Sequence, residues 1–131
     1  YNVWRDLVDN ARHNNDYSKP LEIDLARYNG LTTIDDWKRF SRRVDRYQWV
    51  NWAAYNQHGS LEIRLHEGTL NGDRVVNWVR AHCIFTDWVS RVWHSGVRSA
   101  LWGRTVDEQR EVLADIWGSE LSEFYGLKVL V

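Results

Sequence analysis

SLEIRLHEGTL, residues Ser60–Leu70, is the segment around which the predicted elements of this chain are arranged. Its apolar and polar residues alternate: Leu61, Ile63 and Leu65 against Glu62, Arg64 and His66. Alternation with a period of two is typical of a strand, where side chains two residues apart share a face at a spacing of about 7 Å. The pattern therefore predicts a strand with one apolar face and a row of acid, guanidinium and imidazole on the other. A solvated Glu62–Arg64 ion pair, worth about 0.5 kcal/mol, is an equally ordinary explanation of that row.

The segments on either side of this stretch supply a partner strand and a covering helix. Tyr47–Tyr55 is rich in aromatic residues, which favour strands, and Asn56–Gly59 has a suitable length for a hairpin link. From Asp73 to Trp93 the apolar residues recur at helical spacing. We therefore predict an α+β fold in which an antiparallel hairpin is covered by the Asp73–Trp93 helix. The side chains expected to face that helix are those of Leu61, Ile63 and Leu65.

Two capping boxes mark the starts of further helices. Thr33–Asp36 and Thr105–Glu108 each place a threonine three residues before an acid, and the two side chains can then satisfy each other's backbone N–H groups. The second helix is expected to run to Trp117 and to end at Gly118. Further expected elements include a helix over Val3–Arg12, a short segment over Leu21–Leu25 that is either a strand or the start of a helix, and a short turn of helix over Glu120–Tyr125.

Composition excludes some functional classes. At 131 residues the chain is expected to form a single domain, 1–131, with a sizeable core. Its 17 Lys and Arg and 18 Asp and Glu nearly cancel, so it lacks the overall basic field that nucleic-acid binding favours. No apolar run approaches the ~20 residues of a membrane span, so no membrane partner is expected.

The single cysteine and the absence of methionine lead to further expectations. One cysteine, Cys83, cannot form an internal disulfide, which favours a reducing, cytoplasmic compartment. Because Cys83 falls on an apolar helical face, we expect it to fill the core rather than to act as a nucleophile. A chain without methionine lacks an initiator residue, so we expect a processed product or a fragment.

Several motifs together resemble the C-terminal signature of the amidoligase family, which belongs to the glutamine-synthetase-like carboxylate–amine ligases. The residues that carry the resemblance are Arg46-Tyr47, Asn51, Ser60–Arg64, Glu67–Leu70 and Val76–Val79. The resemblance covers roughly residues 46 to 80, with Ser60 where the family usually has threonine. It implies the C-terminal portion of a glutamine-synthetase-like ligase fold.

The resemblance also implies a chemistry. ATP would activate a carboxylate as an acyl phosphate, which an amine then attacks, with small-molecule or peptide amines and carboxylates as substrates. Glu62 would be catalytic as a ligand of Mg²⁺, and Arg64 would hold the transferred phosphoryl group or the substrate carboxylate. The residues that would bind substrate or nucleotide are Arg46, Asn51, Gly68 and Thr69.

The chain departs from the family in one respect. It has no counterpart of the family's N-terminal acidic strand, its His-x-Asp-x-Ser segment or its glycine- and histidine-containing strand, which supply the other metal ligands. We therefore expect a C-terminal fragment of a larger amidoligase-like domain that needs the missing N-terminal part of the same protein and is inactive alone.

A second hypothesis is a non-catalytic, tryptophan-rich domain for protein–protein interaction or structure. The chain contains nine Trp scattered along its length. In this hypothesis the aromatic side chains form a core or anchor an interface, and Glu62 and Arg64 are a structural pair. The missing acidic motifs, sought upstream in the complete reading frame, would separate the two hypotheses.

Overall fold

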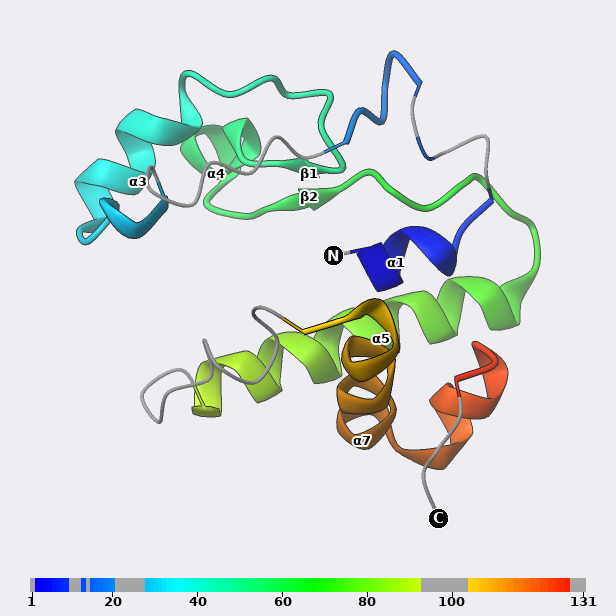
Figure 1. Ribbon diagram of the computed structural model, residues 1–131. Coiled ribbons are helices and arrows are strands. Elements are labelled where there is room, and N and C mark those ends of the chain that lie inside the picture. Colours follow the sequence, from blue (N-terminus) through cyan, green and yellow to red (C-terminus); the bar gives the residue numbers. More distant parts are fainter. Residues whose placement is uncertain (1, 10–12, 14, 21–27, 93–103, 128–131) are drawn as a thin grey trace. The chain divides into compact units, whose positions relative to one another are not determined.

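A computed structural model describes residues 2–9, 13, 15–20, 28–92 and 104–127 of the chain. The described elements, in order, are α1 (Asn2–Asp6), α3 (Ile34–Ser41), β1 (Val50–Asn51), α4 (Ala53–His58), β2 (Glu62–Ile63), α5 (Gly72–Val92) and α7 (Val106–Phe124) (Figure 1). Helices and a two-stranded antiparallel sheet make this an α+β protein, as predicted. The expected Leu21–Leu25 element lies outside the described residues.

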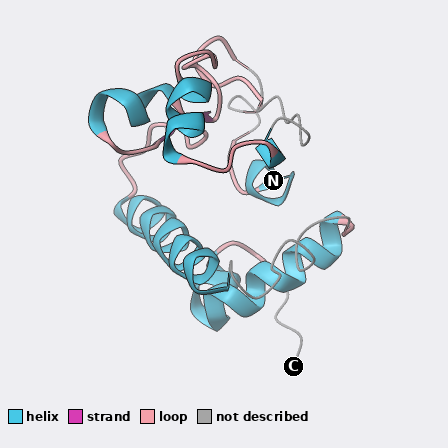
Figure 2. Ribbon diagram, turned by 90° about the vertical axis from the view of Figure 1, so that its left-hand side faces the viewer, coloured by secondary structure: helices cyan, strands magenta, loops and turns pink. Residues whose placement is uncertain are grey.

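The chain divides into two compact units. We call Tyr1–Leu7 with Gly68–Val131 the helical unit, and Val8–Glu67 the strand unit. Helices account for most of the regular structure in the described residues (Figure 2).

Apolar packing between α1, α5 and α7 forms the core of the helical unit. Its buried members are Val3, Ala81, Leu113, Ala114, Trp117, Leu121 and Leu127. The indole Nε1 of Trp117 donates a hydrogen bond of 3.2 Å to the carbonyl of Ala81, so this buried polar group is satisfied. The Trp4 ring meets Trp78 and Trp117 edge to face, with ring centroids 5.6 Å and 5.0 Å away. These three tryptophans are therefore core or core-packing residues.

Helix α7 begins and bends where the sequence predicts. The Thr105 side chain accepts a hydrogen bond from the N–H of Glu108, and the Glu108 carboxylate accepts one from the N–H of Thr105. At Gly118, φ is 74° and ψ is 178°, a conformation that essentially only glycine adopts. Gly118 therefore ends the first helical segment, as expected, and a second segment follows it within α7.

The other helix predictions meet with mixed outcomes. The Thr33–Asp36 capping box is confirmed, with both reciprocal hydrogen bonds present at the start of α3. Helix α1 ends at Asp6, well before the expected end at Arg12. The N–H of Leu7 donates to the carbonyl of Trp4 (3.3 Å), a bond to the third residue back that tightens the last turn.

Helix α5 matches the predicted Asp73–Trp93 segment closely, but the expectation for Cys83 is wrong. Cys83 is exposed, whereas the buried residues of α5 are Trp78 and Ala81. The buried side of α5 therefore centres on these two residues. Val76 and Val79, which precede Cys83 at helical spacing, are also exposed.

In the strand unit, β1 and β2 pair antiparallel as predicted, with Val50 opposite Ile63 and Asn51 opposite Glu62. The predicted Tyr47–Tyr55 strand is much too long, however. Residues 53–58 form α4 in place of the expected hairpin link. Two alanines favour its start, and Gly59 at φ 68° provides the left-handed end.

The predicted apolar face of the central strand is present only at its end. Leu65 is buried at 5% exposure, but Leu61 and Ile63 are 45% and 39% exposed, so the expectation that both are covered is wrong. The regular ladder spans two residues on each strand. Because the ladder is so short, residues 61–65 do not form one continuous strand with a buried apolar face. The helix expected to cover it, α5, belongs to the helical unit.

Candidate functional site

One carboxylate oxygen of Glu62 is the centre of the candidate site. Glu62 Oε2 accepts hydrogen bonds from Asn51 Nδ2 (2.7 Å) and from a terminal guanidinium nitrogen of Arg64 (2.9 Å). The pairing of β1 with β2 sets Asn51 directly opposite Glu62, which explains the first contact. Asn51 is buried at 4% exposure, so its amide is held firmly in place.

These contacts keep Glu62 ionised. The Asn51 hydrogen bond lowers the pKa of Glu62 from its ordinary value, and the charges of Arg64 and Arg46 act in the same direction against the opposing effect of burial. A carboxylate whose charged form is stabilised in this way carries a full negative charge at neutral pH. About half of the Glu62 side chain is exposed, so it is accessible to a ligand.

Buried polar contacts fix the backbone that carries Arg64. Its N–H donates to the carbonyl of Trp49 (2.7 Å), and its carbonyl accepts a hydrogen bond from the Ser18 hydroxyl (3.1 Å). The Trp49 indole N–H in turn donates to the carbonyl of Ser18 (3.0 Å). Ser18 and Trp49 are almost completely buried. The Arg64 backbone is therefore anchored at both its N–H and its carbonyl.

Tyr47 brings a second guanidinium into the site. The Cζ atoms of Arg46 and Arg64 lie 5.3 Å and 5.5 Å from the centroid of the Tyr47 ring, within the range of cation–π attraction. We call Arg46, Tyr47, Asn51, Glu62 and Arg64 the Glu62 cluster. Tyr47 is not among the site residues predicted from the sequence. Its position next to Arg46, ahead of a strand, is the signal that could have found it.

Gly68 and Thr69 are the two expected site residues that belong to the helical unit. The Thr69 hydroxyl accepts a hydrogen bond from the N–H of Asn71 (3.1 Å), and the Asn71 side chain accepts one from Arg74 at the start of α5 (3.1 Å). A Cβ atom added at Gly68 would meet no atom within 4 Å. In this structure the two residues thus belong to the turn that leads into α5.

The cluster can provide part of a metal site. Among the described residues, no group of three or more His, Cys, Asp or Glu could hold a metal ion. Glu62 Oε1 accepts no hydrogen bond from a described residue, and the buried Oδ1 of Asn51 has no hydrogen-bond partner there. Mg²⁺ prefers such hard oxygen ligands but needs about six of them, several of which are usually water and phosphate. Glu62 therefore fits as one ligand, and the described residues do not complete the set.

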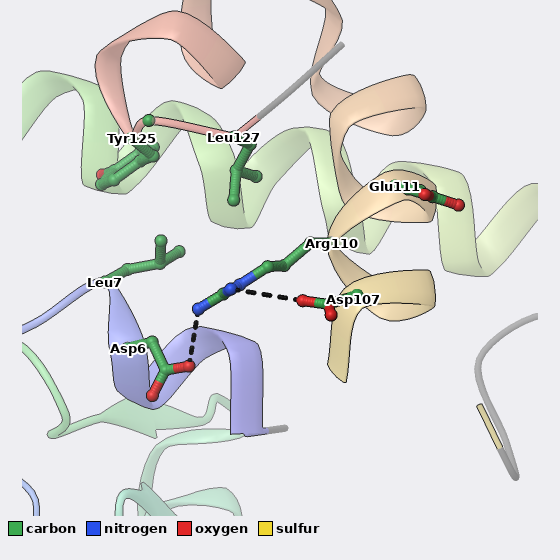
Figure 3. Close-up of a pocket in the computed structure, with 8 residues that line it drawn as sticks. Asp6, Leu7, Asp107, Arg110, Glu111, Tyr125 and Leu127 are labelled. Carbon is green, nitrogen blue, oxygen red and sulfur yellow. Dashed lines mark hydrogen bonds and ion pairs between the residues drawn. The ribbon is translucent and has the colours of Figure 1, made fainter. Parts of the chain in front are cut away.

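A pocket of about 490 Å³ lies in the helical unit (Figure 3). Its lining residues are Asp6, Leu7, Asp107, Arg110, Glu111, Tyr125, Gly126 and Leu127. Arg110 donates to Asp6 (2.9 Å) and to Asp107 (3.5 Å), as the dashed lines in Figure 3 show. Arg110 thus already pairs with Asp107 on its own helix, α7, and with Asp6 on α1, so we interpret this pocket as a structural junction between the two helices.

Comparison of the chain with known protein families, with curated protein sequences and with solved structures returns no match. None of the described helices is both long and apolar enough to cross a membrane.

Proposed function

We propose that this chain is the C-terminal part of an ATP-dependent carboxylate–amine ligase, and that the Glu62 cluster binds the transferred phosphoryl group. One observation carries the proposal. The amidoligase resemblance selects three residues from separate motifs, Arg46, Asn51 and Arg64, and all three act on the carboxylate of Glu62. Asn51 and Arg64 bond to it directly, and the charge of Arg46 helps to lower its pKa.

The chemistry of amide formation explains why such a cluster is useful. A carboxylate must be activated before an amine can attack it, and transfer of a phosphoryl group spreads negative charge over several oxygens. Arginine forks onto phosphoryl oxygens better than lysine does. Arg64 is held by Glu62 and by the Tyr47 ring, so its guanidinium is oriented before a substrate arrives. Arg46 adds a second positive charge.

Glu62 has two roles in this proposal. It orients Arg64, and its second oxygen would be one ligand for Mg²⁺, with the Asn51 carbonyl oxygen close by. A bound Mg²⁺ would supply charge that stabilises the phosphoryl oxygens. The remaining ligands would come from ATP, from water and from the N-terminal part of the ligase. The 131 residues alone are therefore expected to form no amide.

A second candidate, a non-catalytic interaction domain, is favoured by one observation. Val75, Val76 and Val79 on α5 are each about half exposed, and Leu70 ahead of the helix is fully exposed. Exposed apolar residues grouped in this way are typical of surfaces that bind other proteins. In this candidate the Glu62 cluster would only support the fold, so changing it would affect no reaction.

Trapping with hydroxylamine tests the ligase proposal. Hydroxylamine attacks an acyl phosphate to give a hydroxamate, which ferric ion reveals by colour, so the natural amine need not be known. The complete protein that contains this sequence would be incubated with ATP, Mg²⁺, hydroxylamine and a panel of amino-acid and peptide carboxylates. We expect ATP-dependent hydroxamate in the wild type and none in the Glu62→Gln and Arg64→Lys variants.

Arg39→Lys is the matched control. Arg39 forms an exposed ion pair with Asp36 on α3, outside the cluster, so this change should leave hydroxamate formation intact. Wild-type rates in both the Glu62→Gln and Arg64→Lys variants would overturn the assignment and leave the interaction domain as the better account.

A further inference from the structure

We infer that Tyr47 is a positioning residue. Its ring holds the guanidinium groups of Arg46 and Arg64 together, so that they form one binding site for an anion with more than one phosphoryl group. The inference relies on the proposed function only for the kind of anion. The contacts that carry it belong to the strand unit alone.

The ring is shared by two cations that would otherwise repel each other. Both guanidinium carbons lie within 5.5 Å of the Tyr47 centroid, where the negative potential of the ring face attracts positive charge. Glu62 supplies one negative charge against these two positive ones. The five residues of the cluster therefore carry one net positive charge, which favours the binding of an anion.

Tyr47 itself is fixed from several sides. Its N–H donates to Asp45 Oδ1 (2.9 Å), and its carbonyl accepts a hydrogen bond from the N–H of Lys19 (2.7 Å). Its ring meets the ring of Tyr17 edge to face at 5.7 Å. Asp45, the acid nearest in sequence, already forms a 2.8 Å ion pair with the Lys19 ammonium group. These contacts hold the Tyr47 backbone and ring in place beside the two guanidinium groups.

The accessibility of the two arginines indicates the kind of ligand. Arg46 is exposed and donates no hydrogen bond to a described residue, so its donors are available. Arg64 is 17% exposed and directed by its bond to Glu62. A guanidinium group can fork onto two oxygens of one phosphoryl or carboxylate group. A diphosphate can engage both arginines at once, whereas a single small carboxylate would engage one.

Binding of inorganic pyrophosphate to the 131-residue chain tests the inference without any turnover. Isothermal titration at low salt would compare the wild type with Tyr47→Phe, which keeps the ring, and Tyr47→Leu, which removes it. We expect Tyr47→Phe to bind within about twofold of the wild type and Tyr47→Leu to bind on the order of tenfold more weakly. Tyr55→Leu, a half-buried tyrosine on α4 outside the cluster, should bind like the wild type.

NMR can show directly whether the two arginines contact pyrophosphate, which a purely structural role of Tyr47 does not predict. The side-chain Nε–H signals of Arg46 and Arg64 should both shift on addition of pyrophosphate in the wild type and in Tyr47→Phe. If Tyr47→Leu fails to fold, Arg46→Gln tests whether both arginines bind the same pyrophosphate. Arg46 is exposed, so this variant should fold and should bind pyrophosphate more weakly, to an extent similar to that expected for Tyr47→Leu.

Two results would overturn the inference: wild-type affinity in a folded Tyr47→Leu variant, or no binding of pyrophosphate by the wild type. Neither result decides the ligase proposal, which hydroxamate formation tests separately. Hydroxamate formation without pyrophosphate binding would retain the ligase and reject the Tyr47 site.

Discussion

The helical unit and the strand unit are stabilised by different kinds of contact. Among the described residues, the buried side chains of the helical unit are apolar except for Ser122. The strand unit buries four polar residues, Ser18, Ser41, Gln48 and Asn51, in addition to apolar ones such as Trp49 and Leu65. The candidate site lies in this second unit. Apolar packing is non-directional, whereas a buried hydrogen-bond network fixes the orientation of particular groups, as a binding site requires.

The largest expected effect is in the core of the helical unit. Leu121 is 1% exposed, so Leu121→Ala should lower the free energy of unfolding by about 2–5 kcal/mol through lost burial and the cavity it leaves. Urea unfolding followed by tryptophan fluorescence would measure this. Leu70→Ala is the control, because the Leu70 side chain is fully exposed and its loss should cost almost nothing. A similar cost at both positions would contradict the account of the core.

A smaller effect is expected in the strand unit. Ser18→Ala removes the hydroxyl that donates to the Arg64 carbonyl, which should cost about 1–3 kcal/mol of unfolding free energy. The same urea experiment applies, with the exposed Ser60→Ala as the control. If Ser18→Ala unfolds like the wild type, the Arg64 backbone is not anchored in the way described.

The two capping boxes, one in each unit, should behave alike. Thr33→Ala and Thr105→Ala each remove a side chain that accepts a hydrogen bond from the first turn of a helix, which typically costs about 1 kcal/mol. Serine at either position should restore most of the loss. Markedly unequal costs would show that the surrounding unit, rather than the local cap, determines the contribution.

Local signals in the sequence predicted much of the fold. Both capping boxes, the extent of α5 and the break at Gly118 depend on residues close together in the chain, and all appear in the structure. The predictions failed where distant contacts decide. Helix α4 replaces the hairpin link, where the Asn56 side chain bonds to the carbonyl of Lys38 and to the Ser41 hydroxyl on α3.

The candidate site was predictable to a similar degree. Pairing of the two strands implied that Asn51 and Glu62 would lie near each other, and the ladder register bears this out. The support from Ser18 was not predictable, because its bond to Arg64 joins residues 46 positions apart. The role of the Tyr47 ring was not predictable either, because it depends on the conformations of two flexible arginine side chains.

The smallest effects are those of pH on two carboxylates of the strand unit. Hydrogen bonds from Thr33 and Arg39 lower the pKa of Asp36 from 3.8 to about 2. Its stabilising contribution is therefore fully present above its unfolded-state value and is lost as the pH falls through about 2. NMR titration of the side-chain carboxyl carbons should show this value in the wild type and a higher one in Thr33→Ala.

Glu62 gives the matching test at the site. Its pKa is lowered chiefly by Asn51, so Asn51→Ala should raise it, and stability that depends on this carboxylate should then be lost at a higher pH. An unchanged Glu62 titration in Asn51→Ala would show that the amide hydrogen bond contributes little.

In the proposed function, Glu62 serves a reaction rather than the fold, and a paired measurement on two variants separates these roles. Unfolding free energy and ATP-dependent hydroxamate formation would be measured together in the complete protein for Glu62→Gln and for Leu65→Ala. Because the Glu62 side chain is half exposed, Glu62→Gln should alter stability by no more than about 0.5 kcal/mol and abolish the hydroxamate. Leu65 is only 5% exposed, so Leu65→Ala should lower the free energy of unfolding by about 2–5 kcal/mol. The molecules that remain folded should still form the hydroxamate. A Glu62→Gln variant that loses stability but keeps forming hydroxamate would contradict the proposed role of Glu62.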